Sequence, residues 1–188
     1  KGEREYPHDS AAVPEPRQSR VLLIVFEPVD SNEGNRKLVD LMGWKRVDEL
    51  VEGYIADIKE CSYGYVDYQI TEKIEVSAFP RKMDGFRYEM KSYRAALRSR
   101  SGFHHPDQVD YDDILYNYDV IEKINEDLVD EVWLFGFPYA GFYESRMAGP
   151  GAFFCNAPPL KGYEYCRKRF VIMGFNYERG IGEMLENM

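Results

Sequence analysis

The chain has 188 residues, enough for one domain with one core but not for two of full size, and its 44% hydrophobic and 30% charged content is ordinary for a globular protein. Its formal net charge of -9, with no basic stripe to neutralise phosphates, excludes a nucleic-acid partner. No apolar run approaches the roughly 20 residues that span a bilayer, and no signal-peptide core is present, so a secreted form would be one whose signal has been removed.

The chain is expected to begin with an arm and a buried strand. Residues 1–20 are polar, contain three prolines and show no periodicity, which predicts a flexible arm over 1–20 ahead of a folded domain over 21–188. Val21–Phe26 is a continuous apolar run, typical of a strand buried on both faces.

A helix and a second strand follow. From Asp48, apolar residues recur at helical spacing through Ile58, which predicts an amphipathic helix. After Tyr63-Gly64 the period changes to two, which predicts a strand over 66–76. Strand, helix and strand in this order are the unit of a parallel sheet.

The remaining elements continue this alternation. Their predicted ranges are helices over Tyr88–Arg100 and Tyr111–Glu126, short buried strands over Val132–Phe135 and Phe170–Met173, and a helix from Tyr177. The right-handed crossover rule then favours a single-domain α/β fold, a three-layer sandwich with a mainly parallel sheet. The last helical pattern is still open at Met188, which indicates either a fragment or pairing with another chain at this helix.

Two loops carry the candidate catalytic residues. One, Gly136–Gly151, is long, rich in glycine and aromatic, and the other spans Gly174–Gly180. Open α/β sheets bind ligands outside the carboxyl ends of their strands, so we expect Glu144 and Glu178 to face one cleft. Two carboxylates in different surroundings can divide general-acid and general-base work.

The same loops supply candidate binding residues. Arg146 and Arg179 are suited to bind a carboxylate or an oxyanion, and ion pairs with the two glutamates are the alternative. Asn176 is a second polar candidate, although it and Glu178 also suit the start of a helix. Aromatic anchors for a partner are Tyr139, Phe142 and Tyr143, which otherwise fill the core.

Cysteine and histidine patterns add little chemistry. Cys155 and Cys166 bracket a short loop whose closure by a disulfide would stabilise the fold by about 3 kcal/mol and imply an oxidising compartment. Buried thiols are the alternative, and Cys61 is expected in the core. His104-His105 and the aspartates after them match no metal motif, and no P-loop, dinucleotide fingerprint, HExxH or GxSxG is present, so we expect neither metal nor cofactor.

Part of the chain resembles a group of uncharacterised bacterial proteins. The segments that carry the resemblance are Val129–Gly136, Glu144–Gly151, Cys155–Pro159 and Arg169–Gly180. Most members look extracellular, and some are joined to carbohydrate-binding modules. No reaction is assigned to the group, so the resemblance implies a secreted α/β domain without implying a mechanism. It also implies a chain that continues beyond Met188.

Two functional hypotheses remain. The first is an extracellular hydrolase-like domain that acts on a glycan or peptide polymer through paired carboxylates. The second is a non-catalytic module that binds a glycan or protein partner, or assembles on a surface, through the aromatic, glycine-rich loop. An extracellular location follows from the resemblance, and the sequence is also compatible with the cytoplasm.

Overall fold

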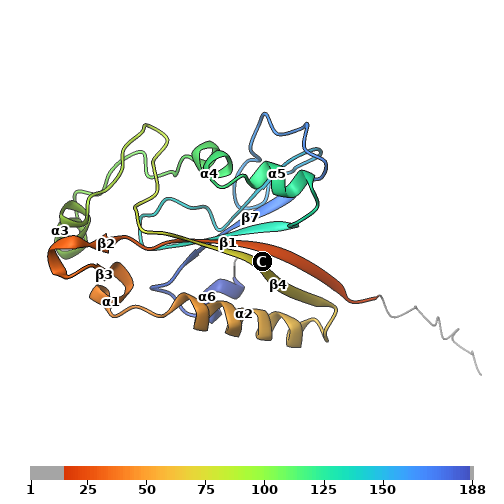
Figure 1. Cartoon of the computed structure of the whole chain (residues 1–188), viewed down its shortest axis with the longest axis horizontal. Helices are drawn as coiled ribbons and strands as arrows, with labels where there is room; N and C mark the ends of the chain where they lie inside the picture. Colours follow the sequence, from red (N-terminus) through yellow and green to blue (C-terminus); the bar gives the residue numbers. More distant parts are fainter. Residues whose placement is uncertain (1–14, 187–188) are drawn as a thin grey trace, which may run out of the picture.

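The computed structural model describes residues 15–186, which form three layers around a five-stranded sheet (Figure 1). In the spatial order β4-β1-β5-β7-β6, the strands are Val66–Val76, Arg17–Phe26, Glu131–Gly136, Phe170–Asn176 and Ser145–Ala148. The first four are parallel, whereas β6 is antiparallel to β7. The predicted α/β sandwich with a mainly parallel sheet is therefore confirmed.

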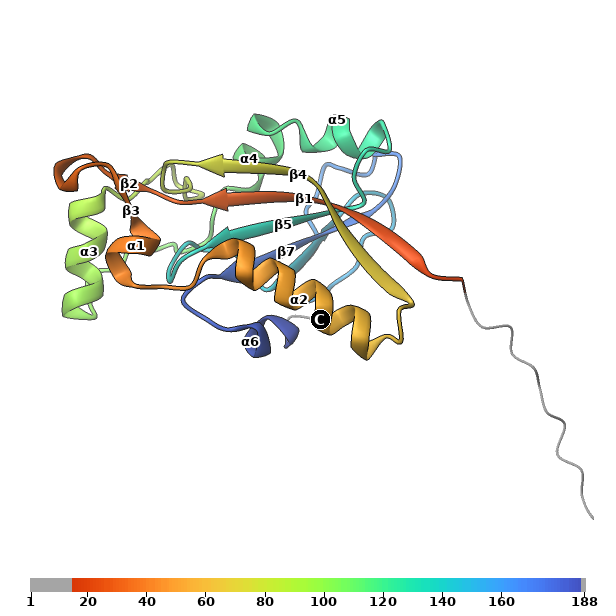
Figure 2. The ribbon, with the colours of Figure 1, turned by 60° about the horizontal axis from the view of Figure 1, so that its bottom comes forward.

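Helices cover both faces of the sheet, as two views show (Figures 1 and 2). On one face lie α2, Val47–Cys61, and α6, Ile181–Leu185, and on the other lie α4, Tyr111–Asn117, and α5, Val120–Asn125. Smaller elements lie beyond the carboxyl ends of the strands. They are a hairpin of β2 (Val29–Asp30) and β3 (Arg36–Lys37), the short helix η1 (Ser31–Glu33) between these two strands, and the helices α1 (Leu38–Met42) and α3 (Met90–Ser99). The connection from β1 to β4 runs through α2 on one face of the sheet, and the connection from β4 to β5 runs through α4 and α5 on the other face. Right-handed connections require this, because β4 and β5 lie on opposite sides of β1.

The core is built around β1 and β5. Every residue from Val21 to Phe26 and every residue of β5 is buried, as a strand covered on both faces requires. Trp133 on β5 meets Tyr54 of α2 and Phe175 of β7 edge to face, with ring centroids 5.3 and 5.6 Å apart. These contacts fix α2 against the middle of the sheet.

Two elements differ from their predicted bounds. β1 begins at Arg17, which pairs with Val66, so residues 17–20 belong to the sheet and not to an arm. The rest of the predicted arm, residues 1–14, lies outside the described residues. The single helix predicted over 111–126 is wrong: Asp119 has a left-handed backbone (φ 52°) that separates α4 from α5. The apolar spacing continues across this break because both helices bury the same face.

A charged cluster closes the amino ends of three strands. Arg20 on β1 donates to Asp130 just before β5, with Nε–Oδ2 and Nη2–Oδ1 distances of 2.9 Å, and it also bonds Asp127. Lys168, just before β7, contacts the same two aspartates. The hydrogen bonds from Arg20 hold the pKa of Asp130 well below its usual value.

Replacing Asp130 by Asn should lower the free energy of unfolding at pH 7 by about 1–2 kcal/mol, because a charge-assisted bidentate contact is lost. A carboxyl whose folded pKa is depressed contributes stability above its unfolded pKa, near 3.8, and loses that contribution as the pH falls towards the folded pKa. The difference between the two proteins should therefore shrink from pH 4 towards pH 2. Urea unfolding across this range measures it, and a difference that stays constant contradicts the assignment.

Candidate functional site

A pocket of about 420 Å³ lies at the carboxyl ends of β5 and β7. It is lined by both predicted loops, by α6 and by Asp107, and the lining residues of the two loops include Tyr139, Glu144, Asn176, Glu178 and Arg179. We call this cavity the β5–β7 pocket. It has the location expected for a ligand site in an open α/β sheet.

The neighbouring crevice between β1 and β5, where the strand order reverses, is filled by aromatic side chains. The ring of Phe142 packs on Phe26 with centroids 5.8 Å apart, and Phe137 meets Tyr177 at 6.2 Å. The Tyr177 hydroxyl is buried and donates to the Phe26 carbonyl at 3.1 Å. The space open to a ligand therefore lies at the carboxyl ends of the next pair of strands, β5 and β7.

Glu144 and Glu178 both line the β5–β7 pocket, and both are exposed to solvent. Glu144 accepts a hydrogen bond from the Asn156 side-chain amide at 3.1 Å. Within residues 15–186, no basic side chain lies within ion-pair distance of either carboxylate, so the alternative of ion pairs with Arg146 and Arg179 is wrong there. The two carboxylates are free to meet a ligand.

Asn176 and Arg179 also line the pocket, but Asn176 does not cap a helix. β7 continues three residues past its predicted end, and the Asn176 side chain accepts from the Glu178 N–H at 2.9 Å in a turn. The helix predicted from Tyr177 begins only at Ile181, where Glu183 accepts from the N–H of Gly180 at 2.8 Å. Arg179 is exposed at the pocket wall.

Arg146 and Tyr143 are not among the lining residues. Arg146 lies on β6, a four-residue strand that the glycine-rich loop sequence does not reveal. Its guanidinium lies 5.1 Å from the ring centroid of Tyr111 and 5.6 Å from that of Tyr143, and its Nε donates to the Pro158 carbonyl at 2.7 Å. The structure thus gives Arg146 and Tyr143 a packing role.

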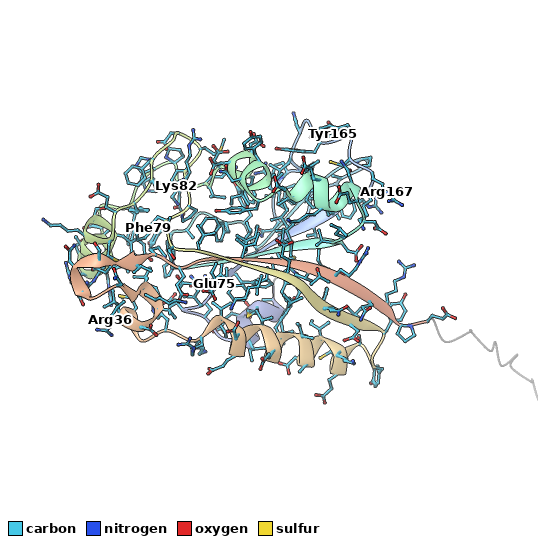
Figure 3. All side chains as sticks on the ribbon, in the orientation of Figure 1. Arg36, Glu75, Phe79, Lys82, Tyr165 and Arg167 are labelled. Atoms are coloured by element: carbon cyan, nitrogen blue, oxygen red, sulfur yellow. The ribbon has the colours of Figure 1, made fainter. Side chains whose placement is uncertain are left out.

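The Tyr139 carbonyl is held at the pocket by the buried Lys82, which is labelled in Figure 3. Lys82, which has no exposed side-chain surface, donates to the carbonyl of Tyr139 at 2.7 Å and to the carbonyl and carboxylate of Asp107 at 2.6 and 2.7 Å. Burial lowers the pKa of Lys82, and the hydrogen bond that its ammonium donates to the Asp107 carboxylate acts against this shift. The ring of Tyr139 stacks on Phe103, and the residue as a whole is 43% exposed. No sequence pattern marks Lys82.

The loop that Lys82 holds also requires glycine at position 141. Gly141 has φ +92°, and a Cβ there would lie 2.0 Å from the Asp107 carbonyl oxygen. Both the left-handed backbone and the close approach exclude larger residues. Glycine therefore lets the loop after β5 lie directly against the segment around Asp107.

The cysteines are all free thiols, so the predicted Cys155–Cys166 disulfide is wrong. Cys166 is buried and packs in the core as a small apolar residue, and burial raises the pKa of its thiol. Cys155 is only partly buried, and its N–H donates to the Ala157 carbonyl within the loop. Cys61, expected in the core, is exposed near the end of α2.

The histidine and aspartate segment has structural contacts. Asp110 accepts from the Asp113 N–H at the start of α4, and His104 stacks on Phe86. Across the described range, no three His, Cys, Asp or Glu side chains are grouped to hold a metal ion. Residues 15–186 also contain no helix with the length and apolar character needed to cross a bilayer.

Comparison with known proteins gives no relative. No protein-family model matches the chain, and no curated protein or solved structure is significantly similar to it. The resemblance to a bacterial, extracellular group therefore stays a prediction.

Replacing Lys82 by Met should lower the free energy of unfolding by about 2–4 kcal/mol, because two carbonyls and a carboxylate lose their donor. Lys161→Met is the matched control, since Lys161 is exposed and should change stability by less than about 0.5 kcal/mol. Urea unfolding measures both variants. Equal stability of the two would refute the role given to Lys82.

Gly141→Ala should destabilise more than Gly162→Ala. Both glycines have positive φ, +92° and +88°, but a Cβ at Gly162 meets no atom within 4 Å. The control carries only the backbone strain of about 1–2 kcal/mol, whereas Gly141→Ala adds a steric clash. Thermal unfolding of both variants measures the difference, and a Gly141→Ala protein as stable as the control contradicts the close approach.

Proposed function

We propose that this chain is a hydrolase-like α/β domain that binds a segment of a glycan or peptide polymer in the β5–β7 pocket and cleaves it with Glu144 and Glu178. One observation carries the proposal: two carboxylates from separate strand-end loops line the same open pocket, and neither pairs with a basic side chain among residues 15–186. The volume of the β5–β7 pocket, about 420 Å³, is within the range of ligand pockets.

The chemistry needs one carboxyl on each side of the scissile bond. One, ionised, removes a proton from the attacking water, and the other, protonated, donates to the leaving oxygen or nitrogen. Asn176 and Arg179, which also line the pocket, offer an amide and a guanidinium to hold polar groups of the polymer. Tyr139, another lining residue, is partly exposed and offers an aromatic side chain for contact with the polymer.

A second candidate function is binding without cleavage. It is favoured by the exposure of both carboxylates, because catalytic carboxyls are often desolvated, and by the exposed Tyr139 ring that Phe103 supports. Here the same pocket would hold a glycan or protein segment as a ligand. An extracellular site of action belongs to both proposals and rests on the resemblance alone, since the free thiols give it no support.

Turnover on a panel of glycans and peptides tests the first proposal, with new reducing ends and new amines as readouts. Glu144→Gln and Glu178→Gln should each lower turnover by about 100-fold or more, because Gln neither accepts nor donates the proton. Glu52→Gln on the exposed face of α2 is the matched control and should leave turnover unchanged.

The result separates the two functions. Binding of a panel member without turnover, lost in Arg179→Ala, identifies a binding module. Turnover that survives both Glu→Gln changes sinks the paired-carboxylate mechanism. A folded protein that neither binds nor cleaves any member contradicts both candidates.

A further inference from the structure

A second hollow lies on the outer side of the α4–α5 layer and shares no lining residue with the β5–β7 pocket. Its volume is about 700 Å³, and its walls come from α4, α5 and the loop before β7. Its lining includes three tyrosines and two acidic residues, and we call it the tyrosine groove. These residues are Tyr116, Tyr163, Tyr165, Asp119 and Glu122.

The aromatic rings of the groove face solvent. Tyr116 is 83% exposed and Tyr165 is 69% exposed, both far from the burial that large aromatic rings usually reach. Tyr163 and Tyr165 are adjacent, with ring centroids 6.3 Å apart and planes at 34°. The Tyr163 hydroxyl donates to Asp112 at 2.7 Å, which fixes this ring in place. Figure 3 shows Tyr165 in the loop beyond the helical layer.

The charged side chains of the groove have one sign. Asp119 and Glu122 line it, and no lysine, arginine or histidine does. Neither carboxylate has an ion pair within the described residues. Asp119 also precedes the first residue of α5 without capping the helix with its side chain. The basic residue Arg167 lies nearby, but only its backbone N–H contacts a lining residue, Asn125, at 2.8 Å.

We propose that the tyrosine groove binds the cationic side chains of an arginine- or lysine-bearing peptide segment. Tyrosine faces attract a guanidinium or an ammonium through their ring electrons, and the two unpaired carboxylates complement the same charge. The net charge of -9 steers such a segment towards the protein. A neutral sugar would use the rings but not the carboxylates. The inference does not depend on the proposed function, because the two cavities share no residue.

Titration with hexa-arginine, hexa-citrulline and cellohexaose tests the proposal. Citrulline keeps the shape of arginine and removes its charge, so we expect binding of hexa-arginine alone. Tyr116→Leu and Tyr165→Leu should each weaken that binding about threefold to tenfold, whereas Tyr116→Phe, which keeps the ring face, should retain it. Far-ultraviolet circular dichroism verifies that each variant is folded.

The charge term needs its own control, because an acidic protein attracts polycations everywhere. Asp119→Asn with Glu122→Gln should weaken hexa-arginine binding strongly, and Asn tolerates the left-handed backbone at position 119. Glu52→Gln with Glu60→Gln, on the opposite face of the molecule, removes the same charge and should change binding less than twofold.

Three outcomes overturn the proposal. Equal weakening by both double variants means attraction by net charge alone. Cellohexaose binding that depends on Tyr116 and Tyr165 means a groove for sugars. No binding of hexa-arginine at low ionic strength rejects the cation site. Glu144→Gln should leave hexa-arginine binding unchanged, so the outcome is separate from that of the polymer-cleavage test.

Discussion

Three segments meet at the ammonium group of Lys82, near the carboxyl ends of the parallel strands. Its own loop follows β4, Asp107 precedes α4, and Tyr139 follows β5, so the contacts join parts of the chain that are up to 57 residues apart. All three N–H donors are used, and burial would make any loss of an acceptor costly. The loop bearing Tyr139 has a second tie, because the Tyr93 hydroxyl donates to the Pro138 carbonyl at 2.8 Å. The shape of the β5–β7 pocket follows from these contacts.

The position of the pocket also follows from how the end of the sheet is packed. In an open α/β sheet the reversal of strand order opens a crevice, here between β1 and β5. Phe142 and Tyr177 occupy it, and their packing adds apolar burial where many folds of this class leave room for a ligand. The adjacent pair, β5 and β7, carries the polar strand-end residues and the hollow. The ends of β1 and β5 are therefore packed with aromatic side chains that stabilise the fold, whereas the ends of β5 and β7 are open to a ligand.

Much of the fold is predictable from local pattern. Burial on both faces gives β1 and β5 unbroken apolar runs, and burial of one face gives α2 a helical period. The break at Asp119 is not predictable, since α4 and α5 bury the same side and the period continues through it. β6 is missed because three partly buried residues and the buried Ala148, in a glycine-rich loop, lack the contrast that marks a strand. In the site, the sequence places Glu144 and Glu178 in the loops that follow β5 and β7. Because these two strands are neighbours in the sheet, the two loops lie at the same place. The partners of Arg146 and Lys82 are tertiary contacts without sequence spacing, so no local pattern could identify them.

Among residues 15–186 no further strand pairs with the two edge strands, β4 and β6, and the composition of these edges bears on how the protein behaves at high concentration. The exposed positions along β4 are Gln69, Thr71, Lys73 and Glu75, which alternate with partly buried residues. On the other side, β6 offers only four residues and runs antiparallel to its one neighbour in the sheet, β7. A charged edge and a very short edge both discourage a strand of another molecule from extending the ladder. The five-stranded sheet therefore resists growth into fibrils from either side.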